Sequence, residues 1–238
     1  MINHPQPAPL GPRYKIKPIE FVEKSIEMLL SISHANSAAF YHIDKNCQTT
    51  EFTLYNISSA IHDDYVSRFA DKDPLNPKLH ASNDSCVLSY REVVDQQAYG
   101  STFLEDFLNH HGLGDAAEMF FRKSGAIFAG ISLFRGESAT FSEGDFGLLK
   151  RVHPFLEYTL QNIFLPHREL ERTRLSEDYS LTAREMDIVD LIRSGASNKH
   201  IVKILSISIG TVKAHLVHIF EKVKVKNRTE LISVLFLD

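Results

Sequence analysis

Charged and aromatic residues are distributed unevenly along this chain of 238 residues, and that asymmetry constrains its organisation most. Residues 195–228 contain seven lysines and arginines but one acidic residue, a net charge of +6, whereas the whole chain carries −4. Of the 24 phenylalanines and tyrosines, only three lie beyond position 170. We therefore expect two domains, an acidic and aromatic-rich one over 1–168 and a smaller one over 179–238, joined by a polar linker over 169–178.

The overall composition narrows the class of protein further. Hydrophobic residues make up 43% and charged residues 24% of the chain, which excludes a wholly disordered or collagen-like protein. The longest apolar run, 126–134, is far shorter than the ~20 residues of a membrane-spanning helix. Residues 1–5 do not open a secretory signal, and Cys47 and Cys86 are too few for a disulfide framework. We expect a cytoplasmic protein with free thiols and without a membrane partner.

The first domain is predicted to combine helices with two β-hairpins. Hydrophobic periodicity and turn residues predict helices over 19–32, 57–70, 102–111 and 143–165, and strands over 37–43, 49–55, 118–122 and 126–134. A capping box, Ser142-x-x-Asp145, opens the last helix, and Ser124-Gly125 predicts the turn of the second hairpin. Consecutive hairpins imply an antiparallel sheet flanked by helices, so the predicted fold class is α+β, an α/β sandwich.

The second domain is predicted to be all-α, with four helices. Thr182-x-x-Glu185 is a capping box that opens the first helix, and Gly195 suits its left-handed end. The second helix covers about 198–205, and Ser208 caps a third over 209–223. Asn227-x-x-Glu230 opens a fourth. The short connection between the second and third helices predicts a helix-turn-helix.

The third of these helices has two different faces. Its core face is apolar and comprises Val212, Leu216, Ile219, Phe220 and Val223. On the opposite face, Lys213 suits guanine O6/N7, and Ala214 and Val217 suit thymine methyl groups. The predicted DNA contacts are Asn198, Lys199, Ser208, Gly210, Thr211, Lys213, Ala214, His215, Val217, His218 and Lys222, among which Lys199, Thr211 and Lys222 suit phosphates. Taken alone, the charge run is more typical of a solvated end of a helical bundle.

Four segments of this domain carry a family resemblance. They are 181–185 (LTARE), 195–201 (GASNKHI), 208–215 (SIGTVKAH) and 224–231 (KVKNRTEL). In this order and spacing they resemble the C-terminal domain of LuxR-type transcription regulators, over about 175–238. The sequence departs from the family at Ser206, where glycine is frequent, and at His200, Val202 and Gly210.

The resemblance implies a function and several partners. It implies a sequence-specific transcription regulator that binds double-stranded DNA through the second and third helices. It also implies a homodimer, often paired through the fourth helix, for which the apolar end at 234–237 is suitable. Activation, the commoner outcome in the family, would add RNA polymerase as a partner. Nucleophile-elbow, zinc-ligand and P-loop motifs are absent from the sequence, so we expect no enzyme, no cofactor and no metal site.

The first domain is expected to sense a signal. Its order of elements resembles GAF and PAS-type sensor domains, and the total length is similar to that of acyl-homoserine-lactone receptors of the LuxR family. Asp73-Pro74 resembles a segment of those receptors, but the chain has no tryptophan, which argues against a standard lactone ligand. The predicted ligand contacts are Tyr41, Tyr65, Phe69, Asp73 and Tyr90. For Asp73 the competing interpretation is an Asx turn before proline, and for the aromatic residues it is simple core packing.

Two hypotheses for the first domain remain open. It binds a small molecule, or it only dimerises or binds a protein partner. A closed apolar cavity would favour the ligand receptor. An exposed apolar stripe along 146–164 would favour the interaction domain.

Overall fold

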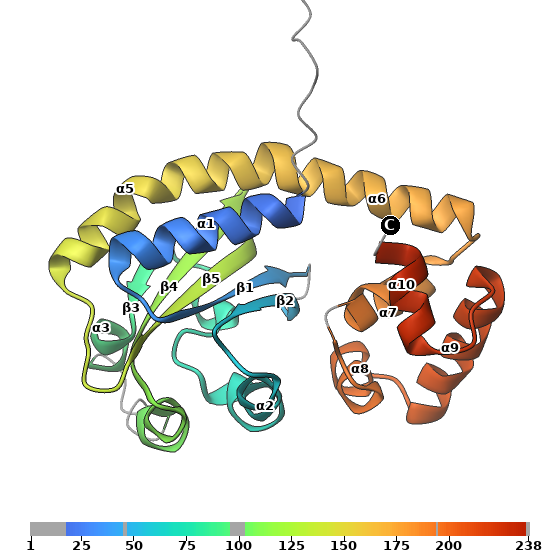
Figure 1. Cartoon of the computed structure of the whole chain (residues 1–238), viewed down its shortest axis with the longest axis horizontal. Coiled ribbons are helices and arrows are strands. Elements are labelled where there is room, and N and C mark those ends of the chain that lie inside the picture. Colours follow the sequence, from blue (N-terminus) through green and yellow to red (C-terminus); the bar gives the residue numbers. More distant parts are fainter. Residues whose placement is uncertain (1–17, 45–46, 96–102, 194, 237–238) are drawn as a thin grey trace, which may run out of the picture.

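The computed structural model describes residues 18–44, 47–95, 103–193 and 195–236. Its N-terminal part contains a five-stranded antiparallel sheet in the order β2-β1-β5-β4-β3. The strands are β1 (Ser37–Ile43), β2 (Thr49–Tyr55), β3 (Val87–Ser89), β4 (Leu113–Lys123) and β5 (Ala126–Gly136). The predicted fold class, an antiparallel α+β domain followed by an all-α domain, is confirmed (Figure 1).

Both predicted hairpins form. The bounds predicted for β1 and β2 agree with the structure, and Ser124 and Gly125 turn the second hairpin with φ angles of 52° and 84°. β4 begins at Leu113, five residues earlier than predicted, because its first half pairs with β5 around a register shift. The sequence analysis missed β3, whose three residues are too few for a periodic pattern.

One face of the sheet is covered by two helices, α1 (Pro18–Ser33) and α5 (Glu143–Thr159), which lie side by side in Figure 1. Val22, Ile26 and Leu29 of α1 and Leu149 and Leu156 of α5 are buried against the strands. The predicted capping box holds the start of α5: Ser142 accepts from the backbone N–H of Asp145, and Asp145 accepts from that of Ser142.

The other face is covered by short helical turns. They are α2 (Ser59–Asp64), η1 (Tyr65–Phe69), η2 (Ala70–Lys72), η3 (Pro77–His80), α3 (Tyr90–Asp95), η4 (Leu104–Leu108) and η5 (Asn109–His111). The helix predicted over 57–70 therefore begins as α-helix and continues as a π-turn and a 3-10 turn. The helix predicted over 102–111 likewise consists of a π-turn and a 3-10 turn from 104 on, and residue 102 lies outside the described residues. Gly112, at φ 72°, ends it as expected.

A long helix leads from the first domain to the second. In Figure 1, α5 continues through η6 (Leu160–Phe164) into α6 (Leu165–Asp178). The segment predicted as linker, 169–178, is thus helical throughout. Pro166 stands in the first turn of α6, where a missing backbone N–H costs little, and the wide π-turn directly precedes it.

The C-terminal part consists of α7 (Ala183–Arg193), α8 (Asn198–Leu205), α9 (Ile209–Val223) and α10 (Arg228–Phe236). The expected caps at Thr182, Ser208 and Asn227 all form. Gly195 has a φ of 81°, and Ser206, where the family frequently has glycine, also adopts a left-handed conformation at φ 52°. A separate core, with Ile188, Ile201 and Ile219 fully buried, holds the four helices together.

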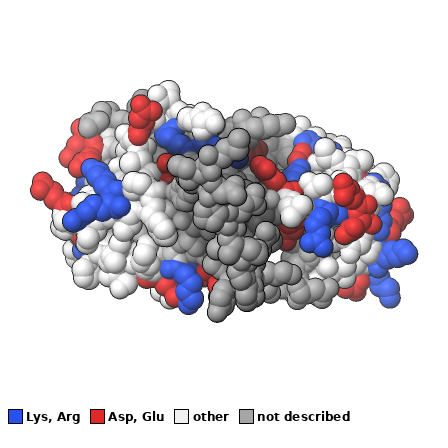
Figure 2. All heavy atoms as spheres, turned by 90° about the horizontal axis from the view of Figure 1, so that it is seen from above, with Lys and Arg blue, Asp and Glu red and all other residues white. Residues whose placement is uncertain are grey.

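The surface charges of the two domains are mixed on one side of the molecule. Figure 2 shows acidic and basic side chains interspersed over both domains, on the side of α5 and α6. Within the described part of the chain, no single helix is long and apolar enough to cross a membrane; only the bent pair of α8 and α9 meets that criterion jointly, by length and composition.

Candidate DNA-binding surface and N-terminal cavity

α8 and α9 have the relative orientation of a helix-turn-helix. They meet at an angle of 110° across a three-residue connection, within the range of about 90–120° typical of that motif. Each begins with a serine cap: Ser197 accepts from the backbone N–H of His200, and Ser208 accepts from that of Thr211 at 3.0 Å. The caps set the first turns of both helices, which contain two of the three predicted phosphate contacts, Lys199 and Thr211.

The two predicted faces of α9 are those observed. Val212, Ile219 and Val223 are buried in the domain core, and Leu216 and Phe220 are half-buried against it. Among the predicted DNA contacts, most are exposed: Lys199, Ser208, Gly210, Thr211, Lys213, Ala214, Val217 and His218. Asn198, His215 and Lys222 are half-buried. The predicted contacts other than Lys222 thus lie along α8 and the accessible side of α9.

Lys199 and Lys213 are the two cations best placed for DNA. Neither forms an ion pair with any residue that the structure describes. Val217, beside Lys213 on the same helix, is 53% exposed. An exposed surface of small and apolar groups beside free cations matches the edges of bases in a major groove.

Lys222 has a different role in this structure. Its ammonium group lies 2.7 Å from the Glu185 carboxylate and donates to the backbone carbonyl of Ser180 at 2.9 Å. Burial opposes the ionisation of Glu185, but hydrogen bonds from Lys222 and Thr182 hold the pKa of its carboxyl group below the usual value. Lys222 therefore ties the end of α9 to the start of α7, and its predicted phosphate contact stays a prediction.

The predicted dimer helix, α10, faces mainly inward. Leu231 and Leu235 are buried in the core of the C-terminal domain, and Phe236 is half-buried against it, with the Arg193 guanidinium 4.5 Å from its ring centre. Val234 is 41% exposed, and residue 237 lies outside the described residues. Val234 is therefore the described apolar side chain of 234–237 most available to a second subunit.

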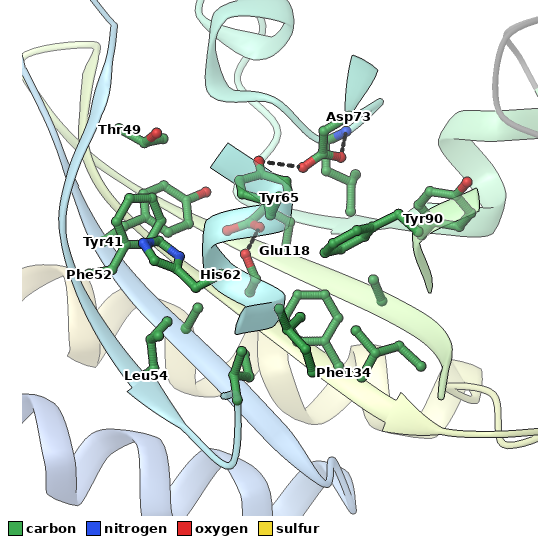
Figure 3. A pocket seen from close by; sticks show the side chains of 18 of the residues that line it. Tyr41, Thr49, Phe52, Leu54, His62, Tyr65, Asp73, Tyr90, Glu118 and Phe134 are labelled. Carbon is green, nitrogen blue, oxygen red and sulfur yellow. Dashed lines mark hydrogen bonds between the residues drawn. The ribbon is translucent and has the colours of Figure 1, made fainter. Parts of the chain in front are cut away.

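A cavity lies within the first domain, on the sheet face opposite α1 and α5. Four of the five predicted ligand contacts line it: Tyr41 on β1, Tyr65 on η1, Asp73 in the following loop and Tyr90 on α3 (Figure 3). The fifth, Phe69, is buried behind the lining and packs against Phe103 and Phe107, which do line the cavity. The centre of a water molecule can occupy about 50 Å³ of this space. Whether these residues contact a ligand stays a prediction.

Asp73 forms the Asx turn considered from the sequence and also lines the cavity. One carboxylate oxygen, Oδ1, accepts from the backbone N–H of Leu75 at 2.8 Å, which is an Asx turn. The other, Oδ2, accepts from the Tyr65 hydroxyl at 2.8 Å inside the cavity. Burial raises the pKa of Asp73 to about 6, although these two hydrogen bonds favour the ionised form.

The sequence analysis missed the second acid of the cavity, Glu118 on β4. This side chain is 2% exposed and its Oε2 accepts from the Ser132 hydroxyl at 2.6 Å. Burial raises the pKa of Glu118 to about 8, against hydrogen bonds from Ser132 and Tyr41 that favour the ionised form. The available signal was a glutamate inside the apolar run 116–121, because an unpaired glutamate is rarely found in a buried strand.

The described residues contain no cluster of three metal-ligating side chains. The His111 ring lies 3.0 Å from the Asp64 carboxylate. Asp64, which also pairs with Arg68, has its pKa lowered to about 2 by those two partners.

Together these features define a class of protein, a helix-turn-helix DNA-binding domain attached to an α+β domain with an internal cavity. The family described as bacterial regulatory proteins, luxR family, matches residues 179–235. A monoamine regulon transcriptional regulator from Klebsiella aerogenes is 31% identical over 213 residues, which cover 89% of this chain and 88% of that protein. The chain therefore belongs to the luxR family of bacterial regulatory proteins, and the resemblance seen in the sequence is confirmed.

Other similar proteins match more loosely. A probable csgAB operon regulator from Salmonella typhimurium is 39% identical over 79 residues, covering 33% of this chain and 37% of that protein. The structure of Escherichia coli SdiA shares 18% identity with a TM-score of 0.43, over 93% of this chain and 91% of SdiA. At that score the likeness says nothing about the ligands of this chain.

Proposed function

We propose that this transcription regulator binds specific operators as a cytoplasmic homodimer, with α9 of each subunit in a major groove. The carrying observation is the accessible side of α9, where Lys213 is exposed and free of ion pairs within the described chain, beside exposed Ala214 and Val217. Charge and small apolar groups on one helix face suit direct base readout.

Selection from a random DNA pool with the full-length protein tests this function. It should yield a two-fold symmetric or near-symmetric consensus. On that consensus, Lys213→Ala should weaken binding by about 1–3 kcal/mol and relax the preference at one base position per half-site. Lys226→Ala, an exposed lysine outside α8 and α9, is the matched control and should leave base preference unchanged. If Lys213→Ala left affinity and preference intact, α9 would not be the reading helix.

We further propose that a small molecule in the N-terminal cavity controls DNA binding, and that it is not a standard acyl-homoserine lactone. The cavity with polar groups among aromatic walls supports this. Occupancy would change how the two linked first domains space the recognition helices, so that both half-sites can or cannot be engaged together. We infer that the outcome is activation, with RNA polymerase as a partner.

The alternative function, a first domain that only dimerises or binds a protein, is favoured by one specific observation. Phe155 and Tyr158 on α5 and Ile163 on η6 are 66%, 68% and 42% exposed. These residues form an apolar surface on the side of α5 away from the sheet. The same surface suits the proposed homodimer, so a ligand-controlled dimer accommodates both observations.

The target genes are a separate proposal. The name of the Klebsiella aerogenes relative refers to a monoamine regulon. Since this chain matches that relative over most of both lengths, we infer that operons for amine use are the first promoters to examine. A promoter-binding survey in the native host would contradict this if its enriched sites lay away from such operons.

A further inference from the structure

Two acidic side chains line the N-terminal cavity without a cationic partner among the described residues. Asp73 and Glu118 both line it, and neither lysine nor arginine occurs among the described lining residues. Neither carboxylate forms an ion pair with any other described residue. Burying an ionised carboxylate without a counter-ion is costly, so such a group either holds a proton or is balanced by a cation that binds beside it.

Glu118 has bonding capacity left over. The Ser132 hydroxyl donates to its Oε2 and Tyr41 interacts with the same carboxylate, but Oε1 is buried and accepts no hydrogen bond from the described residues. Figure 3 shows this carboxylate among the cavity-lining side chains, close to Tyr65. A donor placed in the cavity would satisfy Oε1, and a charged donor would satisfy both the hydrogen bond and the missing counter-ion.

The walls of the cavity are suited to the rest of such a donor. Tyr41, Phe52 and His62 pack in succession, with ring centres 5.7 Å and 4.4 Å apart. Tyr65 and Phe107 form a second pair at 5.5 Å. Aromatic faces attract cations and also accept apolar groups.

We propose that the cavity binds a small organic ammonium ion, a protonated primary amine with a short apolar body, whose nitrogen donates to Glu118. Asp73 lies in the same cavity as the second acidic group, already held by Tyr65 and Leu75. The inference rests on the proposed control by a small molecule and names the chemical class of that molecule.

The size of the cavity limits the amine. The cavity, in which a water centre can occupy about 50 Å³, is large enough for an ammonium group and a few carbon atoms without rearrangement. Benzene occupies engineered cavities of about 150 Å³, so an aryl group would need aromatic side chains to move outward. The probes are therefore n-butylamine and 2-phenylethylamine, each compared with the neutral alcohol of the same shape, 1-butanol or 2-phenylethanol.

Calorimetric titration of the full-length protein at pH 8.5, above the pKa of about 8 that burial gives Glu118, tests the proposal. We expect at least one amine to bind about 10- to 100-fold more tightly than its alcohol, and Glu118→Gln to remove that advantage. Asp73→Asn, which keeps an acceptor for Leu75, should weaken the amine by a smaller factor. Glu143→Gln, an exposed acid at the start of α5, is the matched control and should change nothing.

Glu118→Gln distinguishes a cationic ligand from a neutral one. The glutamine amide is uncharged and can donate a hydrogen bond, as a protonated glutamate does, so it can still bind a neutral acceptor but cannot balance a cation. Equal binding of alcohol and amine, or undiminished amine binding by Glu118→Gln, would overturn the amine and leave control by a neutral ligand standing. Absence of binding by both amines would also overturn it. DNA affinity measured on the same samples reports separately on the proposed regulator function.

Discussion

At the scale of the residue, two pairs of carboxyl groups have pKa values shifted in opposite directions because their surroundings differ. Burial opposes the ionisation of Asp145, but hydrogen bonds from Ser142 and the charge of Arg135 lower its pKa. Hydrogen bonds with Arg68 and His111 lower the pKa of Asp64. Glu118 and Asp73 are enclosed by aromatic rings, and burial raises the pKa of each. The contrast follows from desolvation without a cationic partner, as against ion pairing.

This contrast predicts a pH-dependent stability. Glu118 has a pKa near 8 when folded and near 4.5 when unfolded, so the folded state binds more protons between these values. Folded stability should therefore be greatest below about pH 4.5, as far as this residue contributes, and decline as pH rises to about 8. Glu118→Gln should remove the decline and raise the free energy of unfolding at pH 8, by up to about 5 kcal/mol.

Urea unfolding at pH 5.5 and pH 8 measures the effect. The titratable groups that line the cavity with Glu118 are Tyr41, His62, Tyr65, Asp73 and Tyr90. The variant retains all of them, so the difference between the two proteins isolates this carboxyl group. An unchanged pH slope in Glu118→Gln would mean that the carboxyl group is hydrated in solution.

At the scale of the element, α9 depends on its first turn. Ser208 caps it through the backbone N–H of Thr211, and its hydroxyl lies 2.8 Å from the Thr211 hydroxyl. Ser208→Ala should lower the free energy of unfolding by about 1 kcal/mol and weaken operator binding. Ser208→Asp, which can still cap, should recover the stability but not the DNA affinity, because it adds negative charge toward phosphate.

Thermal unfolding and DNA-binding anisotropy on the two variants separate these effects. If Ser208→Asp recovered DNA affinity together with stability, Ser208 would be a structural cap with no phosphate nearby. Ser197, which caps α8 in the same way, offers the parallel pair of variants.

At the scale of the whole molecule, one covalent segment, α6, joins the two domains, and ion pairs add non-covalent connections between them. α6 continues the long helix of the first domain, and Arg172 on it bonds to Asp187 and Asp190 of α7. Lys203 on α8 also lies 3.2 Å from Asp71 of the first domain, although both side chains are largely exposed and the pair adds little stability. A change in the first domain thus has a helical path to the DNA-binding surface.

The proposed homodimer can be tested at the same scale. Replacing both Phe155 and Tyr158 by glutamate should place charge in the apolar surface of α5 and yield a monomer, since both side chains are exposed and bear little on the core. Light scattering after size-exclusion chromatography measures the mass. Leu79→Glu, at an exposed apolar residue on η3, is the control and should remain dimeric. A dimer that survives the double substitution would direct attention to α10 and Val234.

The sequence by itself determined most of the local elements and the family of this protein, but it missed the short strand β3 and the helical form of 169–178. The bounds of α8 and α9 agree with those predicted, and the caps at Ser142, Thr182 and Ser208 form, because these signals act over three or four residues. Only the tertiary structure decided which distant side chains meet. It brought Glu118 beside the cavity of Tyr65 and Asp73, and it paired Lys222 with Glu185. Burial and pairing depend on every element packed around a group, so no local pattern specifies them.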